Sequence, residues 1–212
     1  MSETTLIKGR VGRVVAADGT SEHIRLGSNA EQIVGDAHGR YHESAYRGGL
    51  FIVSNAVAGV APGTALSTTP PMAIWNPPGS GIVVSINRVS IGYISGTLGA
   101  GSMVHAIAAG QVTVPTGGTE LTPQCAALNS TRGKARCWTG STLVATPLIL
   151  RASAIMGAAL ATSVAFQSVP VDEVAGEILV PEGLVWCYQG VAAAGTTPLV
   201  AIGVVYEEIP VR

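Results

Sequence analysis

Histidine is the side chain in this sequence whose spacing comes nearest to a reactive site. The chain has four histidines, and two of them, His38 and His42, stand four residues apart. That spacing would place both rings on one face of a helix, where they could share a metal ion. A metal site needs three or four converging ligands, however, and the HExxH order of zinc proteases is absent. We therefore predict polar helix surface here, with no metal and no cofactor.

Acidic residues could provide the two carboxylates that glycoside hydrolysis requires. Two acidic pairs are adjacent in sequence, Asp172-Glu173 and Glu207-Glu208. Neighbouring residues of a strand point to opposite faces of a sheet, so neither pair is expected to flank one glycosidic bond. Serine, histidine and aspartate also occur, but no GxSxG or similar motif arranges them as a catalytic triad. These observations predict that the protein is not an enzyme.

Neither the glycines nor the basic residues have the pattern of a phosphate site. The run Gly96–Gly101 has the order G-x-x-G-x-G and precedes a strand-like sequence, whereas a phosphate loop leads into a helix N-terminus. Arg132, Lys134 and Arg136 form a small basic patch, which could be solvated, meet an acidic neighbour or meet a phosphate backbone. Three charges make only a short electrostatic footprint, so we expect no direct nucleic-acid partner.

The large aromatic side chains allow two interpretations. Lectins stack sugars on such rings, and Trp75, Trp138 and Trp186 could do so here. More often these rings anchor a core or an interface through the ring and one hydrogen bond. A carbohydrate-binding, receptor-recognition module is therefore an alternative function.

The composition excludes several classes of protein. Only 12% of the 212 residues are charged and 47% are hydrophobic, whereas about 25% of an ordinary domain is charged. High hydrophobicity with a net charge of −1 excludes a disordered chain and a broadly basic nucleic-acid binder. The 27 glycines and 12 prolines exclude a coiled coil.

The charged residues are unevenly distributed along the chain. About half of them lie in residues 1–50, and between Gly48 and Thr119 the only Lys, Arg, Asp or Glu is Arg88. Interface cores are depleted in Lys, Glu and Asp. This pattern favours a body whose neutral surface is covered by other subunits, over a small-residue β-protein that tolerates a neutral surface.

The charged segment, residues 1–49, is predicted to be an N-terminal arm. Leu6–Ala16 and Ser21–Leu26 have strand-like content, and Asp18-Gly19 between them is typical of a two-residue hairpin turn. We therefore expect the arm to contain a small β-hairpin.

A short helix is expected to follow this hairpin. Ser28–Glu31 fits a capping box, and apolar side chains recur at helical spacing from Ile33 onward. Glu43 and Arg47 form an acid-before-base pair four residues apart, which supports a helix. Gly48-Gly49 would end it.

Residues 50–212 are predicted to form an all-β body. The clearest strand, Gly81–Ser95, alternates apolar and polar residues, and its phase slips at Asn87-Arg88, which predicts a bulge or a turn. About eight short strands separated by turns are typical of a β-sandwich, and we expect a jelly-roll-like one. The other predicted strands are Leu50–Asn55, Ala65–Thr69, Met72–Asn76, Ser102–Ala109, Thr142–Arg151, Ala158–Phe166, Glu177–Val180, Leu184–Ala192 and Leu199–Glu207.

Signals for cellular location are few. The first thirty residues are too polar for a signal peptide, and no run qualifies as a membrane span. Cys125, Cys137 and Cys187 show no CxxC spacing. We expect them to be buried free thiols of a chain made in a reducing compartment.

Several stretches of the chain share turn and composition motifs with one family. They read NAEQIV at 29–34, HGRYHESAYRGGLF at 38–51, ALSTT at 65–69, WNPPGSG at 75–81, ISGTLGAG at 94–101, AGTTPLV at 194–200 and EEIP at 207–210. Together they resemble the small structural proteins of tailed bacteriophage particles. The resemblance covers most of residues 28–210 and contains no catalytic motif.

This resemblance implies a β-sandwich that assembles on a virion, often as a trimer, after synthesis in the host cytoplasm. We expect a capsid cement or decoration protein that ties neighbouring capsomers through its arm. Its partners would be the major capsid protein or other virion proteins. A tail, baseplate or adaptor protein of the same virion is the alternative within this class.

Contacts between subunits are expected in residues 28–51. Tyrosine and arginine are the residue types that most often dominate the energy of interfaces. The expected contact residues are Arg40, Tyr41, Tyr46, Arg47 and Phe51.

Overall fold

The structure is a computed structural model of the whole chain. It describes residues 9–11, 24–26, 39–128, 132–156, 171–192 and 195–211. The chain divides into two compact units, Met1–Arg40 and Tyr41–Arg212. The second unit is the body, and each unit is described below by itself.

The first unit contains two short strands, β1 (Gly9–Val11) and β2 (Ile24–Leu26). They pair in parallel, with Gly9 opposite Ile24. A two-residue turn can join only antiparallel strands, because the chain must cross back along the whole strand before it can begin a parallel partner. The predicted hairpin is therefore wrong, although both strands lie within the predicted segments. The expected Asp18-Gly19 turn and the capping box at 28–31 lie outside the described residues.

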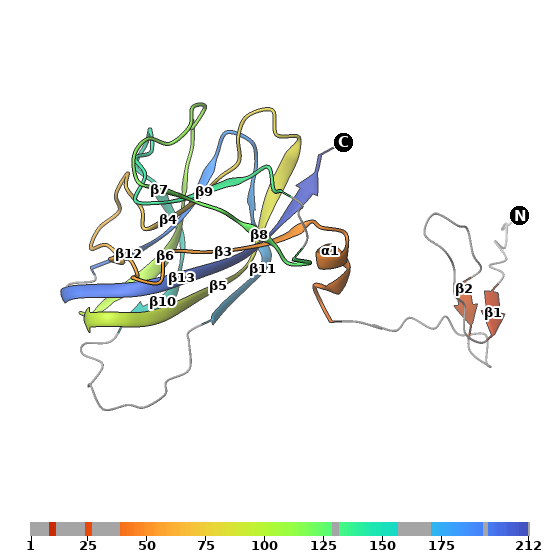
Figure 1. Cartoon of the computed structure of the whole chain (residues 1–212), viewed down its shortest axis with the longest axis horizontal. Helices are drawn as coiled ribbons and strands as arrows, with labels where there is room; N and C mark the ends of the chain where they lie inside the picture. The colour runs from red at the N-terminus through yellow and green to blue at the C-terminus, as the bar shows by residue number, and fades with distance from the viewer. Residues whose placement is uncertain are drawn as a thin grey trace, which may run out of the picture. The chain divides into compact units, whose positions relative to one another are not determined.

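The body is a sandwich of two antiparallel sheets packed face to face (Figure 1), which confirms the predicted all-β sandwich. The six-stranded sheet contains, in order, β10 (Leu148–Met156), β6 (Gly101–Ala108), β12 (Val185–Val191), β4 (Met72–Trp75), β9 (Arg136–Thr139) and β7 (Thr119–Leu121). The five-stranded sheet contains, in order, β11 (Val171–Val180), β5 (Ile82–Thr97), β13 (Thr196–Pro210), β3 (Leu50–Ser54) and β8 (Gln124–Cys125).

The longest pairing in the body joins β5 to β13, which run side by side in Figure 1. Their register shifts by one residue where Val205 lies opposite Arg88 and Tyr206 lies opposite Ile86, so Asn87 is the extra residue of a bulge. This confirms the bulge predicted from the phase slip. The bulge turns both Val89 and Ile86 toward the apolar interior, although they stand an odd number of residues apart.

Two apolar clusters stabilise the body. The larger lies between the sheets and includes Phe51, Ile74, Trp186 and Tyr206. The smaller contains Ala73, Trp75, Trp138, Leu143 and Val185, with Leu66 packed against it. Because strand neighbours such as Ala73 and Ile74 belong to different clusters, the smaller cluster lies on the outer face of the six-stranded sheet. Loops before and after the strands cover it.

All three cysteines are free and buried, as predicted. Burial raises the pKa of the Cys137 and Cys187 thiols well above their ordinary range. Cys137 belongs to the cluster between the sheets, and Cys187 to the outer one.

Other predicted strands differ in extent from those observed. Strand β10 starts at Leu148 rather than Thr142, because Pro147 cannot donate to the ladder. Residues 65–69 are not a strand and form part of a covering loop, and 158–166 lie outside the described residues. Strands β7, β8 and β9 were not predicted, since each has at most four residues and shows little alternation.

Helix α1 (His42–Tyr46) covers the last part of the predicted helix, whereas residues 39–41 are not helical and residues 28–38 lie outside the described residues. It ends as predicted before Gly48, whose φ of 75° suits glycine. The Ser44 hydroxyl donates to Glu207 Oε1 at 2.8 Å, and the Glu208 amide donates to the Gly49 carbonyl at 2.9 Å. Residues 41–49 therefore pack on the body, and the division falls after Arg40 rather than after residue 49.

Two truncations test this boundary. We expect a chain lacking residues 1–40 to unfold cooperatively at the temperature of the intact body. A chain lacking residues 1–49 should have a Tm about 3–6 °C lower, since each lost hydrogen bond contributes about 0.5–1.5 kcal/mol. Calorimetry on both chains measures the difference. Equal Tm values would show that residues 41–49 do not stabilise the body.

Candidate functional site

A cluster of polar side chains lies between the sheets at the edge formed by β10 and β11. His105 on β6 has no exposed surface, and its Nε2 lies 2.7 Å from Asp172 Oδ2 on β11. Arg151 on β10 donates from Nη2 to both oxygens of Asp172 at 2.9 Å. Asp172 belongs to the five-stranded sheet and the other two to the six-stranded one. The cluster is therefore an ionic link between the sheets.

Trp186 on β12 determines which ring nitrogen of His105 carries the proton. Its indole Nε1–H donates to His105 Nδ1 at 3.2 Å, and indole nitrogen can only donate. Nδ1 is therefore an acceptor, and the ring proton lies on Nε2 and is donated to Asp172. Burial lowers the pKa of His105, although the hydrogen bond to Asp172 acts in the opposite direction. His105 is accordingly a neutral imidazole with both nitrogens hydrogen-bonded.

Tyr188 links the cluster to Ser153, a second residue of β10. Its ring packs edge-on against His105 with centroids 5.0 Å apart, and its hydroxyl lies 2.5 Å from Ser153 Oγ. Burial raises the pKa of Tyr188 to about 12, so its hydroxyl stays protonated. Strand β10 is thus attached to this cluster through both Arg151 and Ser153.

This arrangement cannot act as a catalytic triad. A nucleophilic hydroxyl must donate to an imidazole nitrogen whose other nitrogen is held by a carboxylate. Here the nitrogen opposite Asp172 already accepts from Trp186, which has no nucleophilic atom. The sequence offered no signal for this cluster, because His105 is one polar residue in an apolar strand and its partners come from three other strands.

The acidic pairs lie as predicted, with neighbouring side chains directed differently. Asp172 faces the interior, whereas Glu173 pairs with Arg88 on the exposed face. Glu207 accepts from Ser44, and Glu208 accepts from the amides of residues 134 and 135. Each described carboxylate of these pairs therefore binds a separate partner.

The predicted histidine pair does not form a site in the described residues. His38 lies outside them, and the ring of His42 stacks on Tyr46 at 6.2 Å between centroids. No group of three or more His, Cys, Asp or Glu side chains converges within the described part of the chain.

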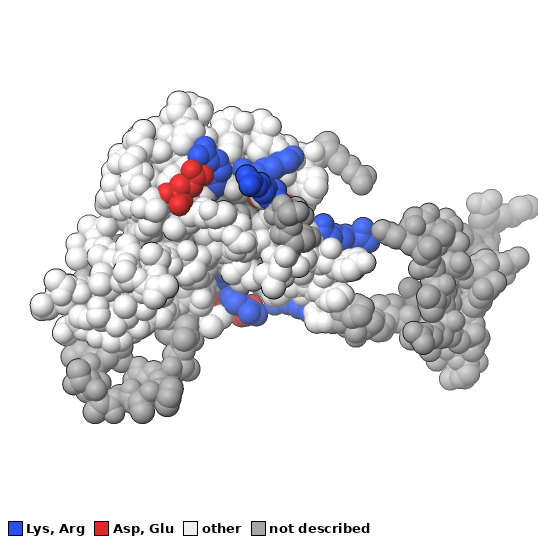
Figure 2. Space-filling model, in the orientation of Figure 1, with Lys and Arg blue, Asp and Glu red and all other residues white. Residues whose placement is uncertain are grey.

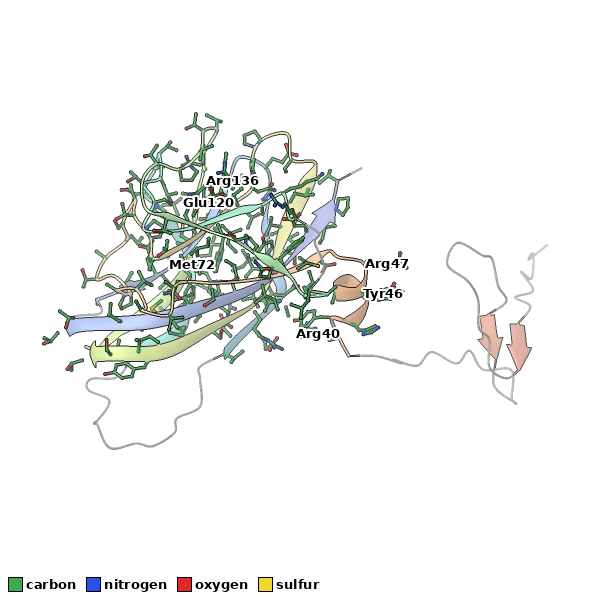
Figure 3. The ribbon with its side chains drawn as sticks, viewed as in Figure 1. Arg40, Tyr46, Arg47, Met72, Glu120 and Arg136 are labelled. Carbon is green, nitrogen blue, oxygen red and sulfur yellow. The ribbon has the colours of Figure 1, made fainter. Side chains whose placement is uncertain are left out.

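The basic patch is mostly held by the body itself. Arg136 lies beside Glu120 (Figure 3) and makes a two-pronged ion pair with it, with both distances 2.8 Å. The Arg136 guanidinium also stacks over the Trp138 ring. The Lys134 ammonium donates to the Ser80 carbonyl at 2.8 Å. The glycine-rich run 96–101 spans the end of β5, the short connection at 98–100 and the start of β6, so a strand and not a helix follows it.

The tryptophans do not provide a surface for sugars. Trp75, Trp138 and Trp186 are all buried, at 4% exposure or less. Trp75 donates to the Gln111 carbonyl beneath the covering loops. The stacking platform that favoured a lectin is therefore absent at these three positions, and they are core anchors.

The expected contact residues do not all share one environment. Tyr46 is 76% exposed, and Arg47 is exposed and pairs with Glu43 as predicted (Figure 3). Arg40 is also exposed, whereas Tyr41 is half-buried beside the Arg88 guanidinium. Phe51 is 2% exposed and stacks on Tyr206 in the main core. Phe51 is therefore a core residue, which corrects its assignment as a contact residue.

The body surface has few charges, and on the face in Figure 2 they form a few separate spots. Large apolar side chains are exposed instead, from loops and from edge strand β10. They include Val57, Val112, Val114, Val144, Leu148, Ile149 and Leu150.

Comparisons with protein-family models, with curated proteins and with solved structures found no match to this chain. No helix in the described residues is long and apolar enough to cross a membrane.

Replacement of Asp172 and of its neighbour Glu173 tests the inter-sheet cluster. Asp172→Ala should lower the free energy of unfolding by about 2–3 kcal/mol, because it leaves the buried His105 N–H without an acceptor. Glu173→Ala removes an exposed ion pair and should cost under about 1 kcal/mol. Urea denaturation measures both. Equal losses would mean that the cluster adds no more stability than a surface pair.

Proposed function

We propose that the protein is a structural component of a virion, most specifically a cement or decoration protein of a bacteriophage capsid. In this role it trimerises on the capsid surface and ties neighbouring capsomers through its N-terminal segment. The observation that carries the proposal is the body surface, which exposes apolar side chains and very little charge.

This surface supports assembly because isolated domains normally keep charge dispersed over their exterior. Residues 49–118 contribute one charged side chain, Arg88, and it is already paired with Glu173. The same stretch exposes Val57, Val112 and Val114. Interfaces that form permanently are large, apolar and depleted in charge, so contact with other subunits accounts for this surface.

The order of the strands gives a second line of support. Strands β3, β13, β5 and β11 lie in one sheet and β4, β12, β6 and β10 in the other. Successive strands of this set alternate between the sheets, except from β6 to β10. We infer a jelly roll from this order, a topology that recurs in viral capsid domains and also in lectins. Because one fold serves many functions, the surface rather than the topology carries the proposal.

The division of the chain fits an arm and a body. The first forty residues form a unit of their own with a separate strand pair. An arm that binds a neighbouring subunit raises the overall affinity without enlarging the body. Once one contact has formed, the linked second contact forms at a high effective concentration. A tail, baseplate or adaptor role would use the same surfaces, and only the number of copies separates it from a cement role.

Quantitative mass spectrometry of purified particles tests the proposal. We expect hundreds of copies of this chain per particle, comparable with the main shell protein. A handful of copies would move the assignment to the tail, baseplate or connector. Absence from particles would exclude a virion role.

Surface variants test the contact residues. Tyr46→Ala and Arg47→Ala should weaken binding to particles that lack this chain by at least tenfold, about 1.4 kcal/mol. Their Tm should not change, because both side chains are exposed. Glu177→Ala, at an exposed charged position on β11 outside the charge-poor stretch, is the matched control and should bind normally. Normal binding by both variants would remove α1 from the interface.

A further inference from the structure

The cluster around His105 has no place for a second ring proton. Nε2–H is donated to Asp172, and Nδ1 accepts from Trp186. A proton added at Nδ1 would turn this nitrogen into a donor facing the Trp186 N–H at 3.2 Å. Two donors cannot bond, so one of the two rings must move before the imidazolium can be accommodated.

Movement of the Trp186 ring would disturb β10. Trp186 is stacked on Tyr188 with ring centroids 5.9 Å apart and planes 17° apart, and both are buried. The Tyr188 hydroxyl in turn binds Ser153 on β10. Displacing Trp186 therefore displaces Tyr188 and its link to that strand.

The charges around His105 come from two neighbouring strands. Asp172 on β11 favours an imidazolium, Arg151 on β10 opposes it, and Tyr188 on β12 stays neutral. Arg88 and Glu173 pair with each other on the exposed side of the five-stranded sheet. Residues 157–170, which connect β10 to β11, contain no ionisable side chain. Protonation of His105 is therefore favoured by Asp172 and opposed by burial, by Arg151 and by the Trp186 N–H donor.

Strand β10 can open without the opening of a central strand. Within the described part of the chain it is an edge strand that pairs only with β6, and its register shifts twice, between Ile149 and Arg151 and between Ala152 and Ala154. Edge strands with irregular ladders open at lower free energy than central strands. Strands β6 and β12 each have partners on both sides.

We propose that His105 is a proton-dependent latch that holds β10 to the sandwich at neutral pH and releases it in acid. The proposal concerns a property of the isolated body and is independent of the role on a virion. In the closed state His105 is neutral. In the open state its ring reaches water, takes up a proton at its ordinary affinity and shifts the equilibrium toward opening.

The size of the effect follows from one proton. An exposed histidine has a pKa of 6.5. If only the open state binds the proton, the opening constant rises about 25-fold between pH 7 and pH 5. The sign is that of a buried neutral base, whose contribution to stability is full above pH 6.5 and falls as the pH drops.

Hydrogen exchange on the full-length chain tests the latch. Exchange rates in β10 at pH 7 and pH 5, each divided by the intrinsic rate at that pH, give the opening constants. We expect the corrected rate in β10 to rise about 25-fold in acid, while β9 (Arg136–Thr139), toward the other edge of the same sheet, stays unchanged. Equal corrected rates in β10 at the two pH values would overturn the proposal, and so would a parallel rise in β9.

Three variants assign the effect to His105. His105→Gln cannot be protonated, so its corrected β10 rate should be the same at both pH values. If His105→Gln does not fold, Trp186→Phe takes its place. This variant keeps a ring but removes the N–H donor that opposes protonation of His105, so it should reduce the acid-induced rise. His42→Gln, an exposed histidine on α1, should behave like the parent chain. An acid-induced rise as large in His105→Gln, or in Trp186→Phe, as in the parent chain would refute the latch.

Discussion

The pairing of β5 with β13 is the interaction on which the rest of the body depends. These two strands occupy the middle of the five-stranded sheet, so β3 and β11 each pair with one of them. Strand β13 also carries Glu207 and Glu208, which bind α1 and the loop before β9. A single long ladder thus positions the neighbouring strands, the helix and the loop before β9. The bulge at Asn87 keeps apolar side chains directed inward on both sides of the change of phase.

The polar cluster at the β10 and β11 edge depends on a different constraint. A neutral imidazole between the sheets is stable only because each of its nitrogens has a partner of the opposite kind. Asp172 also pairs with Arg151, so one carboxylate accepts from both the charged guanidinium and the neutral imidazole of His105. The same residue types that compose hydrolase triads here form an internal support, since the position a nucleophile would occupy belongs to an indole. The cluster therefore joins the two sheets and holds β10 to them.

The sandwich, the bulge at Asn87, the buried thiols and the end of α1 could all be predicted, because alternation, glycine and apolar content are local signals. The His105 cluster could not, because it depends on which strands become neighbours. The parallel pairing of β1 with β2 was missed for a related reason, since Asp18-Gly19 is a strong local turn signal but says nothing of strand direction. Phe51 was misassigned by its proximity to Tyr46 and Arg47, although its position beside Leu50 in an apolar strand already suggested burial.

The three buried cysteines have a consequence for the lifetime of the protein. Oxidants and disulfides react with the thiolate form of cysteine. Cys137 and Cys187 are kept as thiols by their raised pKa, and Cys125 is shielded by the core. None of the three can cross-link to a neighbouring chain while the body is folded. Oxidation of these three thiols therefore requires the body to open first, so its rate is limited by the rate of opening.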